Sequence, residues 1–240
     1  MITEVAVAAN AERTWAYPNE QRGIDMLSSL LDASSPPKAY QDTMYRIGRL
    51  LAEKLYEEHK LSSKSKVCIV STVEDADFLS KGVYDTLSEK GQELYFVCVW
   101  NQRESMFDGG TTVAPIIRKF MQPGYENSDE MIVVKSIISG SCVVKTNITA
   151  LFDKIRPKKI HVVSPVMHED SAMKLLREFP SNYSELFDFE FLAKDRERNN
   201  NTGEVSPGIG GNVYERLGFA NQADKNKYWP KLVRSMLHEM

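Results

Sequence analysis

The segment Lys66-Val-Cys-Ile-Val-Ser-Thr72 decides the class of fold that this chain predicts. Its central residues are apolar without alternation, which is typical of a strand buried on both faces of a parallel sheet. A helical pattern follows at 76–90 and ends before Gly91, a residue type that commonly follows helix C-termini. A further apolar strand is expected at 93–100. An apolar strand, a helix and a second apolar strand together predict a β-α-β unit.

The same alternation continues along the rest of the chain. Further strands are expected at 131–138, 159–166 and 186–193, with helices at 146–155, 169–179 and 225–238. Before the first strand, apolar residues recur at helical spacing from Tyr40 to Tyr56, and one helical turn is expected at 24–31. The pattern predicts an α/β fold with a doubly wound parallel sheet of about five strands flanked by helices. Residues 1–37 are expected to form an N-terminal helical arm, and residues 38–240 the α/β domain.

Composition excludes several classes of protein. The chain has 240 residues, of which 42% are hydrophobic and 26% charged, as in ordinary globular domains. A net charge of −3 and the lack of a clear basic patch give no attraction to nucleic acid. No apolar stretch approaches the roughly 20 residues that span a membrane, and no secretory signal is expected. The odd number and wide spacing of Cys68, Cys98 and Cys142 argue against disulfides and zinc. We therefore expect a cytoplasmic protein without a metal site built on cysteine.

Ligands of doubly wound sheets bind at the carboxyl ends of the strands, near a switch in strand order. The loops expected there are Ser71–Asp77, Asn101–Thr112, Ser139–Lys145, Pro165–Asp170 and Lys194–Arg216. Arg103 and Arg118 flank the second of these loops and are candidates for clamping an anion.

The last loop contains the most distinctive motif of the chain. Three glycines and a proline fall within Pro207-Gly-Ile-Gly-Gly211. Such a segment forms neither a helix nor a regular strand, and glycine lets backbone amides approach a ligand closely. Together with the strands before it, this loop resembles the base-binding loop of uracil phosphoribosyltransferases, whose core reads Pro-Gly-Leu-Gly-Asp. From Tyr40 to Phe219, the order of expected elements is also similar to that family of the phosphoribosyltransferase superfamily.

The resemblance implies a set of binding residues. The base-binding residues would be Val205, Pro207, Gly208, Ile209, Gly210 and Gly211. Asp195 would face the sugar, and Arg216 would meet a phosphate. Residues 134–143 resemble the loop that binds phosphoribosyl pyrophosphate (PRPP). Its phosphate-binding residues would be Ser139, Gly140, Ser141, Lys145 and Thr146. The alternative is an ordinary turn into a helix that is capped by Thr146 or Asn147.

Two loops depart from the family pattern. The PRPP loop of the family opens with acidic residues that hold the ribose hydroxyls, whereas Lys135 or Ser136 stands there in this chain. A lysine cannot accept hydrogen bonds from hydroxyl groups. The pyrophosphate loop of the family carries arginine, but the corresponding Thr72-Val-Glu-Asp-Ala-Asp77 is acidic. It would repel pyrophosphate unless a cation intervened, so Mg²⁺ is left open as a cofactor and no other is expected.

The carboxylates of this acidic loop are Glu74, Asp75 and Asp77. In one interpretation they form the acidic first turn of the following helix, where the helix dipole favours them. In the other they are catalytic at a ribosyl centre, where one carboxylate stabilises positive charge and another activates water.

Three functions remain open at this point. The chain is a diverged phosphoribosyltransferase-like protein that binds a nucleobase, nucleotide or PRPP-like ligand, with altered N-glycosidic chemistry. Alternatively, it is a non-catalytic nucleotide-binding, sensor or assembly module of a regulatory or anti-phage system. The third function is conventional uracil salvage. By analogy with the family we expect a homodimer, and a partner protein is left open.

Overall fold

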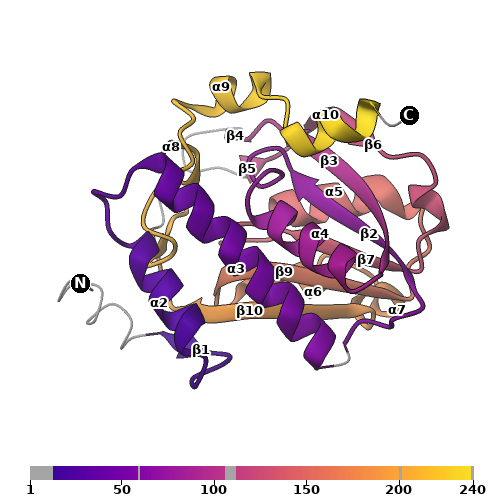
Figure 1. The fold of residues 1–240 in the computed structure, drawn as a ribbon, viewed down its shortest axis with the longest axis horizontal. Coiled ribbons are helices and arrows are strands. Elements are labelled where there is room, and N and C mark those ends of the chain that lie inside the picture. Colours follow the sequence, from indigo (N-terminus) through magenta and orange to yellow (C-terminus); the bar gives the residue numbers. More distant parts are fainter. Residues whose placement is uncertain (1–12, 59, 106–111, 200–201, 239–240) are drawn as a thin grey trace.

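The computed structural model describes residues 13–58, 60–105, 112–199 and 202–238 of the chain. Parallel strands form the centre of the main sheet: β2 (Lys66–Thr72), β3 (Glu93–Asn101), β7 (Glu130–Val134), β9 (Lys159–His168) and β10 (Phe187–Asp195). Antiparallel strands lie at its edges, β1 (Thr14–Trp15) and β6 (Ile116–Met121), and the short β8 (Ile137–Ile138) pairs with β9. The strand order is β1-β10-β9-β7-β2-β3-β6 (Figure 1).

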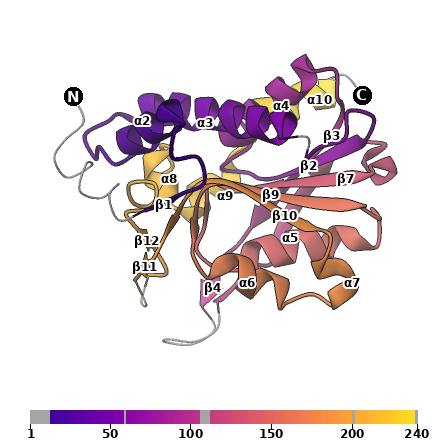
Figure 2. The same cartoon turned by 90° about the horizontal axis from the view of Figure 1, so that it is seen from below.

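Helices cover both faces of this sheet (Figure 2). One face carries α2 (Gln21–Leu30), α3 (Pro37–Glu57), α4 (Leu79–Glu89) and α10 (Lys231–His238). The other carries α5 (Cys142–Phe152), α6 (Ser171–Leu176) and α7 (Ser181–Ser184). Short elements complete the described chain: η1 (Tyr125–Asn127), α8 (Val213–Arg216), α9 (Gln222–Lys227), the hairpin β4–β5 (Glu104–Ser105 and Thr112–Val113) and the hairpin β11–β12 (Glu197–Arg198 and Val205–Ser206). The predicted fold class, a largely parallel sheet between two layers of helices, is confirmed.

Two hydrophobic cores lie in the molecule, and the apolar patterns in the sequence account for them. Every residue of β2 after Lys66 is buried, because helices cover both faces of this strand. Helices α3 and α4 approach closely at two glycines. A Cβ atom on Gly48 would lie 2.1 Å from the carbonyl oxygen of Leu79, and one on Gly82 would lie 2.1 Å from that of Tyr45. These contacts bring both helices onto the same face of the sheet.

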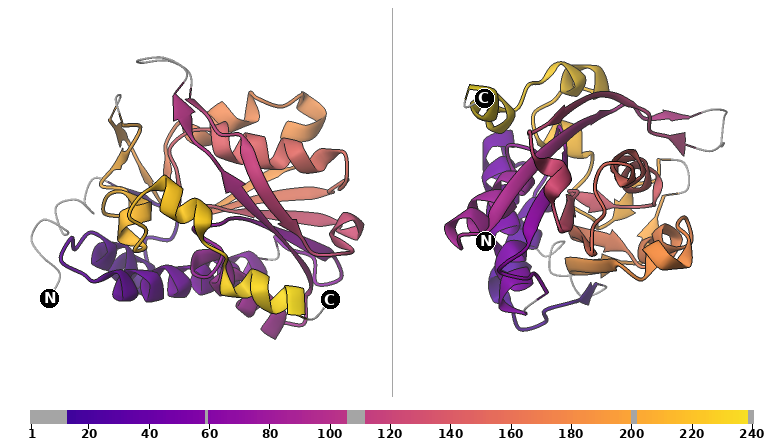
Figure 3. Two further views of the ribbon diagram at one scale, coloured as in Figure 1. Left: turned by 90° about the horizontal axis from the view of Figure 1, so that it is seen from above. Right: turned by 90° about the vertical axis from the view of Figure 1, so that its right-hand side faces the viewer.

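The connection order places a switch point at the centre of the sheet. From β2 the chain first adds β3 on one side and later adds β7 on the other. The loops that leave the carboxyl ends of β2 and β7 therefore diverge, which opens a crevice typical of ligand sites in such folds. The hairpins β4–β5 and β11–β12 project from the same end of the molecule (Figure 3). The predicted ligand edge is therefore the end at which the long loops gather.

Some predicted boundaries were wrong. The last helix, expected at 225–238, is divided into α9 and α10 by residues 228–230. Pro230 explains the break, because proline lacks the N–H that a continuous helix would use. The helix expected at 146–155 begins earlier, at Cys142, and that expected at 76–90 begins later, at Leu79. None of the described helices combines the length and apolar character that crossing a membrane requires.

Candidate functional site

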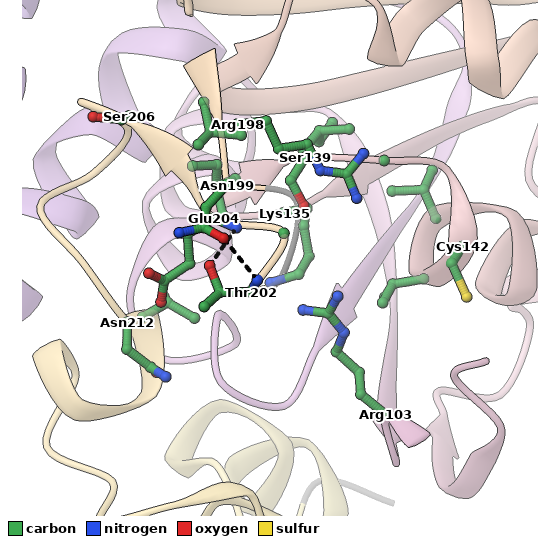
Figure 4. Close-up of a pocket in the computed structure, with 18 of the residues that line it drawn as sticks. Arg103, Lys135, Ser139, Cys142, Arg198, Asn199, Thr202, Glu204, Ser206 and Asn212 are labelled. Atoms are coloured by element: carbon green, nitrogen blue, oxygen red, sulfur yellow. Dashed lines mark hydrogen bonds between the residues drawn. The ribbon is translucent and has the colours of Figure 1, made fainter. Parts of the chain in front are cut away.

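A cleft of about 1020 Å³ opens at the carboxyl ends of the central strands. Its walls come from the loop after β7, the start of α5, the hairpin β11–β12 and the segment that leads into α8. In Figure 4, Arg103 and Lys135 point toward the space between the β11–β12 hairpin and Cys142 at the start of α5. Cationic side chains therefore enter the cleft from strands that are separated in the sequence.

Lys135, the first residue after β7, is committed to protein partners. Its Nζ lies 3.1 Å from Glu74 Oε1 and 3.2 Å from Asp75 Oδ2, and it donates to Ser136 Oγ at 3.1 Å. Asp75 Oδ2 also accepts from the backbone N–H of Ser136 at 3.1 Å and from the hydroxyl of Thr72 at 2.9 Å. All of these residues are buried. The ion pairs therefore tie the loop after β2 to the loop after β7 across the switch point.

A second buried lysine reaches this cluster from α9. Lys225 Nζ donates to the carbonyl oxygen of Asn101 at 2.8 Å and lies 3.8 Å from Glu74 Oε2. It also sits 4.9 Å from the ring centroid of Tyr214. The cluster thus contains two carboxylates and two ammonium groups, so its formal charges balance.

Burial and pairing shift the titration of these groups in opposite directions. Burial alone would raise the pKa of Glu74, but the ammonium groups of Lys135 and Lys225 hold it below its ordinary value. Burial raises the pKa of Asp75, and the attraction of Lys135 only partly opposes it. Burial would lower the pKa of Lys135, but the charges of Asp75 and Glu74 raise it above its ordinary value. Burial lowers the pKa of Lys225. At neutral pH, Glu74 is the carboxylate that these pairings keep ionised.

Glu74 also faces the cleft. Its side chain is 4% exposed, and its Oε2 makes no hydrogen bond to any residue that the structure describes. A buried acceptor without a donor carries a desolvation cost, which a hydroxyl or amino group of a ligand would offset. Of the three predicted catalytic carboxylates, Glu74 lines the cleft and Asp75 lies behind it.

Asp77 has a different role. Its carboxylate accepts the backbone N–H groups of Lys231 at 2.7 Å and Leu232 at 2.8 Å, and it also accepts the hydroxyl of Tyr228. It therefore caps α10 instead of lining the cleft. The alternative prediction, that these carboxylates form the acidic first turn of the following helix, is wrong. Helix α4 begins at Leu79 and has no acidic residue in its first turn.

We expect Asp77→Ala to lower the free energy of unfolding by about 0.5–2 kcal/mol, as loss of a helix cap does. Urea denaturation followed by circular dichroism measures this change. The control is Asp42→Ala, which removes an exposed ion pair with Lys38. A normal stability of Asp77→Ala together with lost ligand binding would instead return Asp77 to the functional site.

The start of α5 provides an anion-binding geometry. Ser139, Gly140 and Ser141 line the cleft immediately before α5, and the N-terminus of a helix favours an anion. The guanidinium of Arg198 approaches this turn, with Nη2 3.8 Å from the position of a Cβ atom on Gly140. Arg103 lines the cleft as well. In the part of the chain that the structure describes, neither guanidinium forms an ion pair with a carboxylate.

Two predicted phosphate ligands lie beyond this turn, and the Ser141 hydroxyl within it donates to Glu178 Oε1 at 3.2 Å. Lys145 forms an ion pair with Glu178, and Thr146 is not among the lining residues. The reason is the earlier start of α5, which places both residues beyond the turn that lines the cleft. The proposed cap at Thr146 or Asn147 is wrong for the same reason.

The two ends of the glycine loop, residues 205–211, line the cleft, whereas its middle packs against the protein. Val205, Pro207 and Gly211 face the cleft, whereas Gly208, Ile209 and Gly210 are not among the lining residues. The backbone of Ile209 accepts the hydroxyl of Tyr40 at 2.9 Å. Of the six predicted base-binding residues, the structure places Val205, Pro207 and Gly211 at the cleft, and contact with a base stays a prediction.

Two further predicted residues are structural. Asp195 is 1% exposed and pairs with Arg13 and the N–H of Gly208, so it does not face a sugar. Arg216 donates to the carbonyl oxygens of Leu30, Asp32 and Ala33 beyond the C-terminus of α2. Its two terminal nitrogens are therefore engaged by the backbone, while Nε has no hydrogen-bond partner among the described residues.

Sequence reasoning missed Arg198, Tyr214 and Lys225. Arg198 stands in a polar hairpin without a motif, and Lys225 lies within what looked like an ordinary amphipathic helix. A signal for the central ion pairs did exist. A lysine follows one central strand and three carboxylates follow another, and opposite charges at neighbouring strand ends can pair. Of the predicted anion clamps, Arg103 lines the cleft, whereas Arg118 stacks on Trp100 and Trp229.

Solved structures similar to this chain include a ppGpp-bound hypothetical protein from Neisseria gonorrhoeae, with 12% identity over 65% of this chain and 80% of that one (TM-score 0.43). A hypoxanthine phosphoribosyltransferase from Trypanosoma cruzi matches at 13% identity over 65% and 75% (0.41), and a hypoxanthine-guanine phosphoribosyltransferase from L. donovani at 12% over 66% and 84% (0.37). No protein-family model and no curated protein matches the sequence. Phosphoribosyltransferases thus occur among the similar structures, and at this distance they carry nothing about ligand or activity. The narrower resemblance to uracil phosphoribosyltransferase stays a prediction.

Proposed function

We propose that this protein binds a phosphorylated, nucleotide-like ligand in the cleft and does not transfer a phosphoribosyl group from PRPP. The observation that carries the proposal is the pairing of Lys135 with Glu74 and Asp75. By the resemblance, Lys135 stands where the family carries a ribose-binding acid, and its charge is neutralised by carboxylates inside the protein. The site that would hold PRPP for transfer is therefore closed by internal ion pairs.

The remaining donors suit a ligand with two different ends. The turn Ser139–Ser141 before α5 and the side chain of Arg198 would hold a phosphate. Glu74 Oε2, which lies 3.8 Å from Lys225 Nζ but makes no hydrogen bond to the described residues, would accept a hydroxyl or amino group. A nucleotide carries an anionic group and several such donors, which makes it the simplest class of ligand with both.

Calorimetric titration with UMP, GMP, uridine and guanosine tests the proposal. We expect at least one nucleotide to bind, and its nucleoside to bind at least tenfold more weakly, because the nucleoside lacks the phosphate. A tenfold change in affinity corresponds to about 1.4 kcal/mol. A parallel incubation with PRPP, Mg²⁺ and uracil or guanine, followed by mass spectrometry, is expected to yield no new nucleotide. Formation of UMP or GMP would overturn the non-transfer part of the proposal.

We expect Arg198→Ala to weaken nucleotide binding by roughly tenfold or more, because a charge-assisted hydrogen bond contributes about 1.5–3 kcal/mol. The control is Arg196→Ala, two residues away on an exposed side chain that pairs with Glu169 outside the cleft. Equal losses in both variants would show that general surface charge, and not the cleft, attracts the ligand.

Glu74 favours a second candidate, cleavage of an N-glycosidic bond. An ionised carboxylate at the cleft wall would stabilise the positive charge that develops at C1 of ribose. The C–N bond breaks and its electrons leave with the base. The oxygen of water bonds to C1, and a proton from that water goes to the base. Release of free base from UMP or GMP, lost in Glu74→Gln while binding persists, would support this candidate. No base release by the unaltered protein would eliminate it.

A further inference from the structure

Arg13 lies directly before β1 and is fully buried with its partner, Asp195. Its Nε lies 3.1 Å from Asp195 Oδ1, and its Nη2 lies 3.2 Å from Asp195 Oδ2. Two guanidinium nitrogens thus lie within ion-pair distance of the carboxylate, and the Nη2 contact is the one that is also a hydrogen bond. Nη2 also donates to the carbonyl oxygen of Gly208.

The pair holds Gly208 by both of its backbone groups. Asp195 Oδ2 accepts the Gly208 N–H at 2.8 Å, while Arg13 donates to the Gly208 carbonyl. Gly208 has a φ of +56°, and a Cβ atom there would lie 2.3 Å from the carbonyl oxygen of Val205. The backbone at Gly208 is thus tightly bent, and the side chains of Arg13 and Asp195 hold it by hydrogen bonds.

Gly208 lies between the two stretches of the glycine loop that line the cleft, 205–207 and 211–214. A shift at Gly208 therefore moves both stretches relative to the start of α5. Strand β1 itself pairs with β10 only at Thr14 and Trp15. The Arg13 side chain adds a direct hydrogen bond from the start of this strand to the loop, at Gly208.

We propose that Arg13 and Asp195 are positioning residues that set the shape of the ligand cleft by latching the glycine loop to β1 and β10. The binding part of this inference rests on the proposed function, whereas the latching part does not. Burial opposes the charge of both groups, since it lowers the pKa of Arg13 and raises that of Asp195. The pair is therefore retained at a cost in desolvation, which a purely space-filling role would not require.

Hydrogen exchange of residues 205–212 without ligand tests the latch. We expect exchange there to quicken by roughly tenfold or more in Arg13→Met, which corresponds to the loss of about 1.4 kcal/mol or more of local stability. Arg13→Lys should fall between, because lysine keeps the charge but lacks the two-nitrogen geometry. Asp195→Asn should recover part of the loss in Arg13→Met, since it removes the unpaired buried charge. The matched control is Arg22→Met, whose side chain is 60% exposed on α2.

The same variants are then titrated with UMP and GMP. Affinity for the nucleotide that the unaltered protein binds should fall at least roughly tenfold in Arg13→Met and less in Arg13→Lys. If exchange at 205–212 in Arg13→Lys and Arg13→Met equals that of the unaltered protein, or rises no more than that of β9, the latch is refuted. If neither nucleotide binds the unaltered protein, the proposed function fails while the exchange result still decides the latch.

Discussion

A Lys135→Met variant is expected to lose about 3–5 kcal/mol of unfolding free energy, because breaking a buried ion pair leaves its partners charged and unpaired. Lys135 Nζ serves Glu74 and Asp75 together, at 3.1 and 3.2 Å. Lys225 remains 3.8 Å from Glu74 and offsets part of the loss there. Chemical denaturation at pH 7.5 measures the change. A loss below about 1 kcal/mol would contradict this expectation, because ion pairs screened by solvent contribute no more than that.

The defect should depend on pH in a defined direction. Removal of Lys135 takes away a charge that lowers the folded-state pKa values of Glu74 and Asp75, so both rise relative to the unaltered protein, and that of Asp75 moves further above its ordinary value. The folded state then binds protons that the unfolded state releases, so its stability falls as pH rises through the raised values. The gap between Lys135→Met and the unaltered protein should therefore narrow as pH is lowered from about 7.5 to 5. A gap that stays constant or widens would contradict this account.

Two controls separate charge from packing. Lys145→Met removes an ion pair whose side chains are 43% and 37% exposed, and it should change stability by no more than about 1 kcal/mol. Combining Lys135→Met with Asp75→Asn should recover part of the loss, because one buried charge is removed along with its partner. No recovery would indicate that the methionine itself packs badly.

The layers of this fold were predictable because they follow from local patterns. Runs such as Val67–Val70 are apolar on both faces, and α3 repeats apolar residues at helical spacing. The short edge strands were missed for a physical reason. Strand β6 reads Ile-Ile-Arg-Lys-Phe-Met and exposes several of its residues, so its pairing with β3 depends on contacts that are remote in the sequence.

The candidate site was only partly predictable. The turn Ser139–Ser141 and Glu74 do line the cleft, since both follow strand ends. The direction of a loop side chain is set by tertiary partners, and the sequence does not show these. Asp77 is drawn to α10, 154 positions away along the chain at Lys231, and Asp195 is drawn to Arg13, 182 positions away. In the sequence, Asp77 stood beside Glu74 in the same acidic loop, and Asp195 was placed near a sugar by the family resemblance alone.

Gly210→Ala is expected to be among the most destabilising single substitutions in the chain. Gly210 has a φ of +82°, and a Cβ atom there would lie 2.0 Å from the carbonyl oxygen of Leu30, which is backbone and cannot rotate away. Strain at such a φ costs about 1–3 kcal/mol by itself. The clash adds to this cost, because α2 and the glycine loop must then separate. Thermal and urea unfolding measure the total.

Gly91→Ala isolates the two contributions to that loss. Gly91 has a φ of +77°, close to that of Gly210, but a Cβ atom there meets nothing within 4 Å. Its loss should therefore equal the backbone strain alone, about 1–2 kcal/mol. The excess loss in Gly210→Ala measures how firmly the loop is pressed on α2. Equal losses in the two variants would mean that the loop can leave α2 freely, so that the cleft lacks a fixed wall on this side.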